Sequence, residues 1–254
     1  MILKGSINMD KQLKDYQIRV VEELYDFFNF YLNKDGKEIV FKAPTGSGKT
    51  FIMTKLLEKI SLEKENDKIA FIWVSIGKGN LHKQSYGSVK GELKGYPDCQ
   101  LLDVSFVSAN SYIKDKQILF VNWEKLIQKN RRNDTWKNSL MKDQEGRNFI
   151  DLIEETKKRD LKICLIVDES HIGLSKDTSI SILRDEIISP TVTINMSATP
   201  NRKPDVEVTL EEAISEGMIK QQLIINKDIS LNSPDGSDDQ DSVNLVLEKA
   251  EKQR

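Results

Sequence analysis

The sequence predicts an α/β fold in which a mostly parallel sheet is covered by helices on both faces. Three observations predict it. Strand-like segments alternate with segments of helical spacing along most of the 254 residues. Several strand segments, among them 68–76 and 161–169, are continuous apolar runs, which is typical of strands buried on both faces. Residues suited to chemistry follow directly after such runs, where parallel sheets bind their ligands.

The elements are predicted in regular order. Residues 13–32 form a helix, because Leu13, Tyr16, Val20 and Leu24 recur at spacings of three and four. Strands are predicted at 37–42, 68–76, 99–107, 116–122, 161–169 and 191–199. Further helices are predicted at 50–60, 123–130, 149–159 and 180–188. Two segments show no clear pattern, the turn-rich 77–98 and the polar 130–148, and the second is predicted to be an inserted loop.

The composition restricts the class of protein. A net charge of −2 argues against a wholly basic nucleic-acid binder, although a local basic groove remains compatible with it. Cys164 lies in an apolar run and is expected to be a buried thiol, and neither it nor Cys99 has a metal-ligand spacing, so a reducing, cytoplasmic location is expected. No secretory signal is visible, and no run approaches the roughly 20 apolar residues that cross a bilayer.

Residues 43–50, APTGSGKT, match the phosphate-loop pattern between a predicted strand and a predicted helix, with Ala43 in place of the first glycine. Gly46 and Gly48 let backbone N–H groups approach phosphate oxygens without a Cβ in the way. Lys49 adds a charge near the β- and γ-phosphates, and the Thr50 hydroxyl can bind Mg²⁺. A loose surface turn is the alternative, but the flanking strand and helix favour the nucleotide. The residues expected to hold it are Pro44, Thr45, Gly46, Ser47, Gly48, Lys49 and Thr50.

Residues 165–171, LIVDESH, end a second buried strand with two adjacent acids. Such a pair is costly unless a cation faces it, and nucleotide-bound Mg²⁺ is the natural partner. Asp168 is expected to hold the ion, and Glu169 to orient and activate the attacking water. With Lys49 they form the predicted catalytic set. The alternative is a solvated helix cap. His171 adjoins the acids and is expected to link the nucleotide to other parts of the protein.

Three motifs in this order resemble those of superfamily 2 helicases and translocases: a phosphate loop, an Asp-Glu-x-His box at 168–171 and a Ser-Ala-Thr triplet at 197–199. Four stretches are most similar to the helicase part of the restriction subunit of type III restriction-modification enzymes: LFVNWEKL, LIEETKKR leading into LIVDESH, MSATPNRKPDVEVTLEEAISEGMIKQ, and the polar insert. The likeness runs from about residue 12 to 229. It implies a RecA-like P-loop NTPase fold, ATP and Mg²⁺ as cofactors, and ATP-driven motion on duplex DNA.

The resemblance also implies roles for individual residues. Tyr16 and Gln17 lie where the family has its adenine-reading element, so Gln17 is expected to hydrogen-bond the base while Tyr16 packs nearby. Ser197 and Thr199 take the coupling positions of the triplet.

The composition of the C-terminal segment and the same resemblance together divide the chain, and the resemblance suggests partners. Residues 1–33 would be an N-terminal helix with the adenine-reading element, 34–229 the first RecA-like domain, and 230–254 an acidic linker with the start of a truncated following domain. A second RecA-like domain and a nuclease domain are expected to be missing from this chain, and a modification methyltransferase subunit is one candidate partner. The fragment is then expected to hydrolyse ATP weakly and to cleave no DNA.

In this superfamily the first domain holds nucleic-acid phosphates with loops that follow its second and third strands. The corresponding residues here are Lys78, Lys83, Gln84 and Asn122, and their contacts would be sequence-independent and salt-sensitive. Trp123 is either a base-stacking residue or a core residue. Two other functions stay open: an RNA helicase domain, or a nucleotide-dependent interaction module with vestigial hydrolysis.

Overall fold

The structure is a computed structural model, and all of its described residues belong to the first of the chain's two units, residues 1–219, the second being 220–254. The described residues are 13–34, 36–75, 80–126, 129–130, 135–136, 140–141, 147–168 and 182–219. Three expected site residues, Lys78, Glu169 and His171, lie outside them. Within these ranges, no helix combines the length and the apolar composition needed to cross a membrane.

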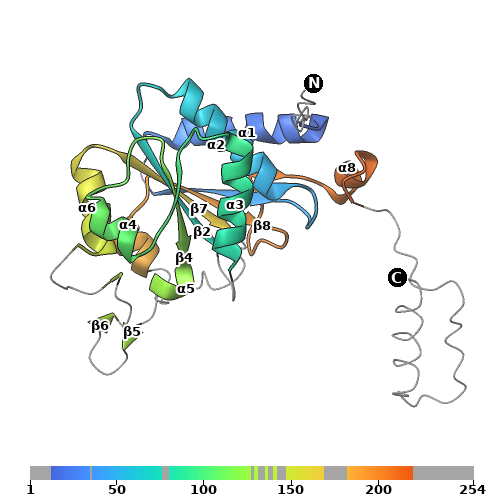
Figure 1. Cartoon of the computed structure of the whole chain (residues 1–254). Coiled ribbons are helices and arrows are strands. Elements are labelled where there is room, and N and C mark those ends of the chain that lie inside the picture. The colour runs from blue at the N-terminus through green and yellow to red at the C-terminus, as the bar shows by residue number, and fades with distance from the viewer. Residues whose placement is uncertain are drawn as a thin grey trace, which may run out of the picture. The chain divides into compact units, whose positions relative to one another are not determined.

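Seven parallel strands form the central sheet of the described part, in the order β3-β4-β2-β7-β8-β1-β9 (Figure 1). Their bounds are β1 Lys37–Lys42, β2 Ile69–Ser75, β3 Cys99–Leu101, β4 Ile118–Asn122, β7 Lys162–Asp168, β8 Val192–Ser197 and β9 Val206–Glu207. β2 and β8 are buried at every position. The predicted α/β fold with a parallel sheet is confirmed. The continuous apolar runs are strands buried on both faces, as inferred from the sequence.

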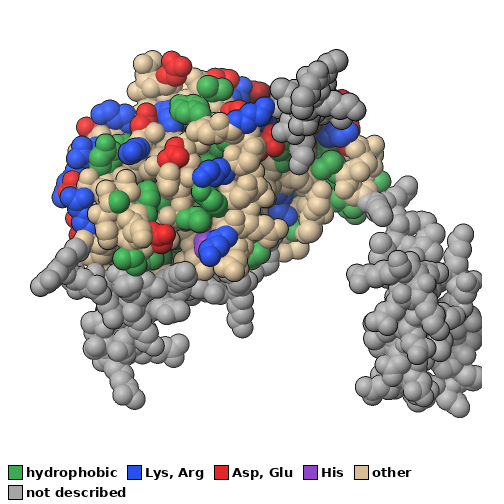
Figure 2. All heavy atoms as spheres, in the orientation of Figure 1, with side chains coloured by type: hydrophobic (Ala, Val, Ile, Leu, Met, Phe, Trp, Pro, Cys, Tyr) green, Lys and Arg blue, Asp and Glu red, His purple; other side chains and the backbone are tan. Residues whose placement is uncertain are grey.

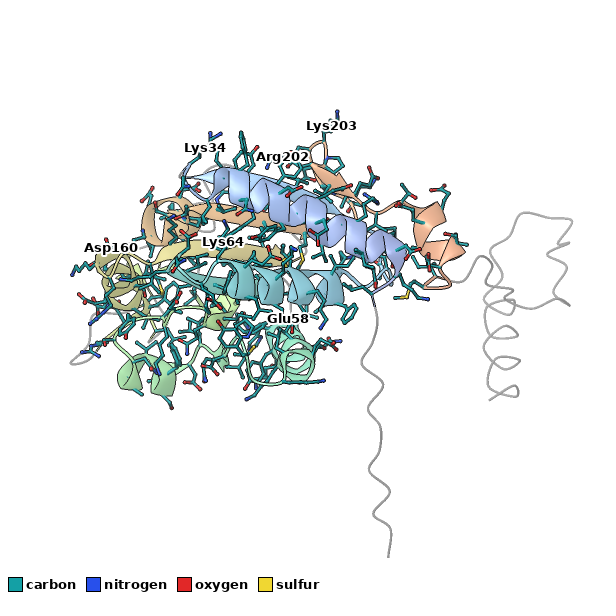
Figure 3. All side chains as sticks on the ribbon, turned by 90° about the horizontal axis from the view of Figure 1, so that it is seen from above. Lys34, Glu58, Lys64, Asp160, Arg202 and Lys203 are labelled. Carbon is teal, nitrogen blue, oxygen red and sulfur yellow. The ribbon has the colours of Figure 1, made fainter. Side chains whose placement is uncertain are left out.

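Three helices cover one face of the sheet: α1 (Asp15–Tyr31), α2 (Lys49–Glu63) and α3 (Leu81–Leu93). Helices α1 and α2 lie side by side in the view of Figure 3. The predicted stripe of α1 buries Tyr16, Val20 and Leu24 in this core, so its spacing is confirmed. Helix α2 begins directly after the phosphate loop, and α1 packs against α2.

The other face is covered by α4 (Val104–Ala109), α5 (Trp123–Leu126), α6 (Phe149–Lys158) and the short π-helix η1 (Leu183–Ile188). Trp123 is 1% exposed in this core, which favours the core role over base stacking. The polar insert also contributes, because Leu140 and Met141 are buried against the same cluster. The insert further contains a small antiparallel ladder, β5 (Lys129–Asn130) with β6 (Thr135–Trp136), so it is more than a loop.

One sequence-based assignment was wrong, and one segment for which no structure was predicted contains a helix. The strand predicted at 99–107 ends at Leu101, and α4 follows, because the Asp103 carboxylate accepts a hydrogen bond from Phe106 N at 2.7 Å and caps a new helix. The turn-rich segment contains α3, whose buried positions are His82, Ser85, Val89 and Leu93. Two of these four are polar, which hid the helical spacing from a search for apolar residues.

One difference in extent and two unpredicted elements remain. The helix predicted at 123–130 is only the four-residue α5, and Lys129 already belongs to β5. Strand β9 and helix α8 (Leu210–Ser215) were not predicted. Asp205 brings β9 to β1, since its carboxylate accepts from Val40 N at 2.7 Å and its own N–H donates to Val40 O at 2.9 Å.

Candidate functional site

The phosphate loop joins β1 to α2 at the carboxyl edge of the sheet. Its turn is closed by Ser47, whose N–H and hydroxyl both donate to Pro44 O, at 3.2 and 2.8 Å. Gly46 and Gly48 have φ of +88° and +87°, a left-handed conformation that L side chains rarely adopt. The two glycines are therefore required by the backbone itself, as the sequence pattern predicted.

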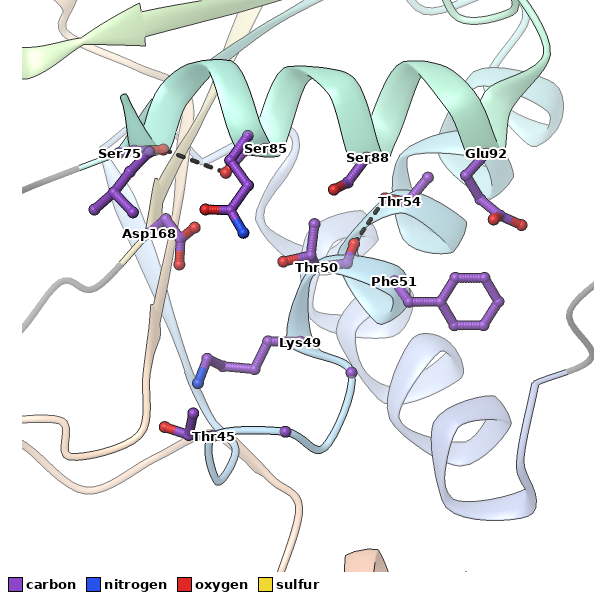
Figure 4. A pocket seen from close by; sticks show the side chains of 14 residues that line it. Thr45, Lys49, Thr50, Phe51, Thr54, Ser75, Ser85, Ser88, Glu92 and Asp168 are labelled. Carbon is purple, nitrogen blue, oxygen red and sulfur yellow. Dashed lines mark hydrogen bonds between the residues drawn. The ribbon is translucent and has the colours of Figure 1, made fainter. Parts of the chain in front are cut away.

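A cavity of about 660 Å³ opens beside this loop (Figure 4). Its walls come from the loop, from the first turns of α2, from one side of α3, and from the ends of two strands. Ser75 ends β2 and Asp168 ends β7, and the two are register partners in neighbouring parallel strands. The volume lies within the range of roughly 300–1,000 Å³ that is usual for small-molecule and cofactor sites.

Lys49, Thr50 and Asp168 all line this cavity, and Figure 4 shows them around one space. Lys49 is half-buried, and its Nζ donates to Ala43 O at 3.2 Å, within the loop itself. Asp168 is half-buried at its strand end. A cation, a hydroxyl and a carboxylate from two separate segments therefore meet beside the glycine turn, as expected from their positions after parallel strands.

These residues suit a magnesium nucleotide. Magnesium usually keeps several waters and takes one or two carboxylates together with substrate phosphates, rather than an all-protein cage. In the part of the chain that the structure describes, no three His, Cys, Asp or Glu side chains form a metal cluster. One carboxylate, Asp168, and one hydroxyl, Thr50, beside a backbone turn built for anions match that need.

Tyr16 and Gln17 contact the phosphate loop but are not among the residues that line the cavity. The Tyr16 hydroxyl donates to Ser47 O at 2.6 Å, and burial raises the pKa of Tyr16, which keeps the hydroxyl protonated. Gln17, only 2% exposed, donates to Ser47 O and to Tyr16 Oη, both at 3.3 Å, and accepts from Lys14 N at 3.0 Å. The observed role of the pair is to hold the loop against α1. An adenine contact by Gln17 stays a prediction.

The Ser-Ala-Thr triplet begins beside the phosphate loop. Ala43 N donates to Ser197 O at 3.1 Å, and Ser197 Oγ accepts from Thr199 N at 3.0 Å. Ser197 is buried whereas Thr199 is exposed. The main chain therefore connects the start of the loop to the triplet, while a coupling role for the two side chains stays a prediction.

Of the expected nucleic-acid residues, Lys83, Gln84 and Asn122 are among those described, and they come from α3 and from the end of β4. Gln84 lines the cavity, whereas its neighbour Lys83 is exposed and does not. Asn122 ends β4 and is the register partner of Ser75, so Asn122, Ser75 and Asp168 form one row along the sheet edge. On the face shown in Figure 2, the Lys and Arg side chains are interspersed with Asp and Glu rather than gathered in one patch.

Sequence reasoning missed the wall that α3 supplies, which includes Ser85, Ser88 and Glu92, and it missed Phe51 and Thr54 of α2. Phe51 and Thr54 lie in the first turns of the helix that follows the phosphate loop, so their spacing from the loop could have predicted that they line the cavity. Nothing local marks the residues of α3, because their place depends on how that helix packs against α2.

Comparisons with known proteins agree with this fold. The family model described as "Type III restriction enzyme, res subunit" matches residues 10–202. A search of the curated proteins finds no match.

The solved structures that are similar to this chain include the following two. One is a nuclease-deletion mutant of the Type ISP restriction-modification enzyme LlaGI in complex with a DNA substrate mimic, with TM-score 0.52 and 13% identity, covering 82% of this chain and 21% of that one. The other is the Sulfolobus solfataricus SWI2/SNF2 ATPase core in complex with dsDNA, with TM-score 0.51 and 13% identity, covering 79% and 35%. This chain thus spans about a third or less of each. It belongs to the family of type III restriction enzyme res subunits and has the RecA-like fold of superfamily 2 helicase cores.

Proposed function

We propose that this chain is the ATP-binding and ATP-hydrolysing motor domain of a DNA translocase or helicase, as part of a type III restriction subunit. The observation that carries the proposal is the meeting of Lys49, Thr50 and Asp168 in one cavity beside the left-handed glycine turn. Duplex DNA is the proposed track, with support from the two similar proteins, whose structures contain DNA or a mimic of it. A second RecA-like domain, a nuclease and a methyltransferase subunit are proposed partners of the whole protein.

The residues divide the chemistry between them. When bound, the magnesium nucleotide supplies a phosphoanhydride whose terminal phosphoryl group can be transferred to water. Gly46 and Gly48 let backbone N–H groups face the phosphates, and Lys49 exchanges its bond to Ala43 O for a phosphate contact. Thr50 and Asp168 hold the ion. Glu169, which follows Asp168 in the chain and lies outside the described residues, is proposed to orient the attacking water.

The first test is nucleotide binding by thermal shift. A ligand that binds only the folded state stabilises it by about 2.7 kcal/mol at 100 times its Kd, so millimolar ATP with Mg²⁺ should raise the melting temperature of the chain. Lys49→Ala should abolish most of the rise. Lys59→Ala is a matched control, because Lys59 lies on the same helix and forms ion pairs with Glu22 and Glu63, away from the cavity. An unchanged melting temperature of the wild-type chain would refute nucleotide binding.

The second test is phosphate release with no polymer, single-stranded DNA, duplex DNA or RNA. We expect weak turnover that duplex DNA stimulates. Glu169→Gln should retain nucleotide binding and lose turnover, whereas Asp168→Asn should lose turnover together with the Mg²⁺ dependence of binding. Stimulation by RNA alone would favour an RNA helicase domain. Binding without turnover under every condition would favour an interaction module with vestigial hydrolysis.

A further inference from the structure

Helix α3 presents one side to the nucleotide cavity. Leu81, Gln84, Ser85, Ser88 and Glu92 all line it. Their spacings of three, one, three and four residues place them on a single face of a helix with 3.6 residues per turn. The cavity therefore extends from the phosphate loop to a wall whose residues are mostly polar.

This wall is attached to the strand ends that carry the site. Ser85 Oγ lies 3.5 Å from Ser75 Oγ, which joins the first turns of α3 to the end of β2. Ser75 is in turn the register partner of Asp168, and neighbouring strands lie about 4.8 Å apart. Figure 4 shows Ser75, Ser85 and Asp168 together at this end of the cavity. The residue before Ser85, Gln84, consequently reaches the cavity near the proposed metal ligand.

Lys83 and Gln84 are adjacent in α3 and were both expected to contact nucleic acid, but the fold turns them in different directions. Lys83 and Gln84 are both exposed and lie about 100° apart around the helix axis. Gln84 is on the face toward the cavity, and Lys83 is not among its lining residues. The two side chains serve different spaces, although both were expected to contact nucleic-acid phosphates.

We propose that Gln84 contacts the bound nucleotide rather than nucleic acid, with its amide N–H groups donating to oxygens of the terminal phosphate or to water bound there. This inference rests on the proposed function of the cavity. An amide suits the position of Gln84 because it donates to an anion without carrying charge. A lysine here would pair with Asp168 and compete with magnesium, and a glutamate would repel the phosphates.

The experiment measures two affinities in four single-residue variants of the full chain. Affinity for a non-hydrolysable ATP analogue with Mg²⁺ is measured by fluorescence competition, and affinity for a duplex oligonucleotide by anisotropy without nucleotide. Gln84→Ala should weaken nucleotide binding by roughly 10- to 150-fold, the range for one lost hydrogen bond to a charged group. Its affinity for DNA should change less than twofold. Lys83→Ala is the matched control and should leave nucleotide affinity unchanged, and Lys49→Ala reports on the cavity itself.

A second variant tests the chemistry of the contact. Gln84→Glu keeps the shape of the side chain and replaces the donor by a negative charge, so nucleotide affinity should fall at least as much as in Gln84→Ala. Because Gln84 is exposed, both variants should keep the melting temperature of the nucleotide-free wild type.

The outcomes separate the two claims. If Lys49→Ala weakens nucleotide binding and Gln84→Ala does not, the role of Gln84 is refuted and the proposed function stands. If Gln84→Ala weakens DNA binding more than twofold, with or without a nucleotide effect, Gln84 is a nucleic-acid residue as the sequence suggested. If the wild type binds no nucleotide, or Lys49→Ala has no effect, the proposed function fails and the inference fails with it.

Discussion

Replacing Gly48 by alanine tests how the phosphate loop is held against α1. Gly48 has φ of +87°, and a Cβ built on it would lie 2.7 Å from Gln17 Nε2. That atom belongs to a side chain that is 2% exposed and donates to Ser47 O and Tyr16 Oη. The new methyl group therefore meets both a backbone conformation unfavourable for alanine and a buried amide that hydrogen bonds hold in place.

The expected cost follows from these two contributions. A left-handed conformation costs an L residue about 1–2 kcal/mol. Moving the Gln17 amide gives up two hydrogen bonds, each 3.3 Å long in the structure. Such bonds contribute about 0.5–1.5 kcal/mol each, so the amide adds roughly 1–3 kcal/mol. Gly48→Ala should lower the free energy of unfolding by about 2–5 kcal/mol in total.

Gly46→Ala is the control for backbone strain alone. Gly46 has nearly the same φ, +88°, but its nearest neighbour for an added Cβ is Ile219 Cγ1 at 3.6 Å, an ordinary contact. This variant should cost only about 1–2 kcal/mol. Urea unfolding measures both values. In the Gly48→Ala, Gln17→Ala double variant the effects should be less than additive by about 1–3 kcal/mol, because the clash and the lost bonds are then counted once.

Equal destabilisation by Gly46→Ala and Gly48→Ala would refute this account. Additive effects of Gly48→Ala and Gln17→Ala would refute it as well. Either result would mean that the Gln17 amide moves without cost, and that α1 does not hold the loop through this residue.

Three further predictions concern other parts of the fold. Trp123→Ala should lower the free energy of unfolding by about 3–5 kcal/mol in urea without changing DNA affinity. Trp123→Phe should cost less, because phenylalanine keeps an aromatic ring in the core and the indole Nε1 has no hydrogen-bond partner among the described residues. A stable Ala variant with weakened DNA binding would restore the stacking role. Asp103→Ala should cost about 0.5–2 kcal/mol by removing the cap at Phe106 N, and Asp103→Asn much less, with an equal cost contradicting the cap. Burial raises the pKa of Cys99 from 9.0 to about 12 and also raises that of Cys164. Since these folded-state values exceed the unfolded ones, their contribution to stability is present below about pH 9 and is lost as the pH rises above it. Thermal melts between pH 7 and 11 should show this decline, and it should be smaller in the Cys99→Ala, Cys164→Ala double variant; an equal decline would contradict it.

The sheet and the phosphate loop could be predicted because their signals are local. A strand buried on both faces is a continuous apolar run, and β2 is buried throughout while β7 is buried at all positions except its two end residues. Parallel strands all end at the same edge, so the meeting of Lys49 and Asp168 followed from two separate strand ends. Glycines at Gly46 and Gly48 match left-handed backbone positions that the loop needs.

The helices that were missed are not marked by a pattern of apolar residues. Helix α3 buries His82 and Ser85 beside Val89 and Leu93, so its sequence has no apolar stripe that would predict a helix. Helix α4 depends on one capping carboxylate, Asp103, within what resembles a strand. In both segments polar side chains help to make the backbone helical. In α3 they are buried on the packed face, and in α4 one of them forms the capping hydrogen bond.

The sequence by itself determined the type of sheet, the phosphate loop and the acid at the end of β7, because each depends on a few neighbouring residues and on the common edge of parallel strands. Only the tertiary structure decided which residues surround the cavity. It placed Gln84 in the wall and left Lys83 outside, buried Trp123 in the core, and turned Gln17 toward Ser47 O. These assignments depend on how α1 and α3 pack on the sheet. Long-range packing, rather than the neighbouring residues in the sequence, sets the direction in which each of these side chains points.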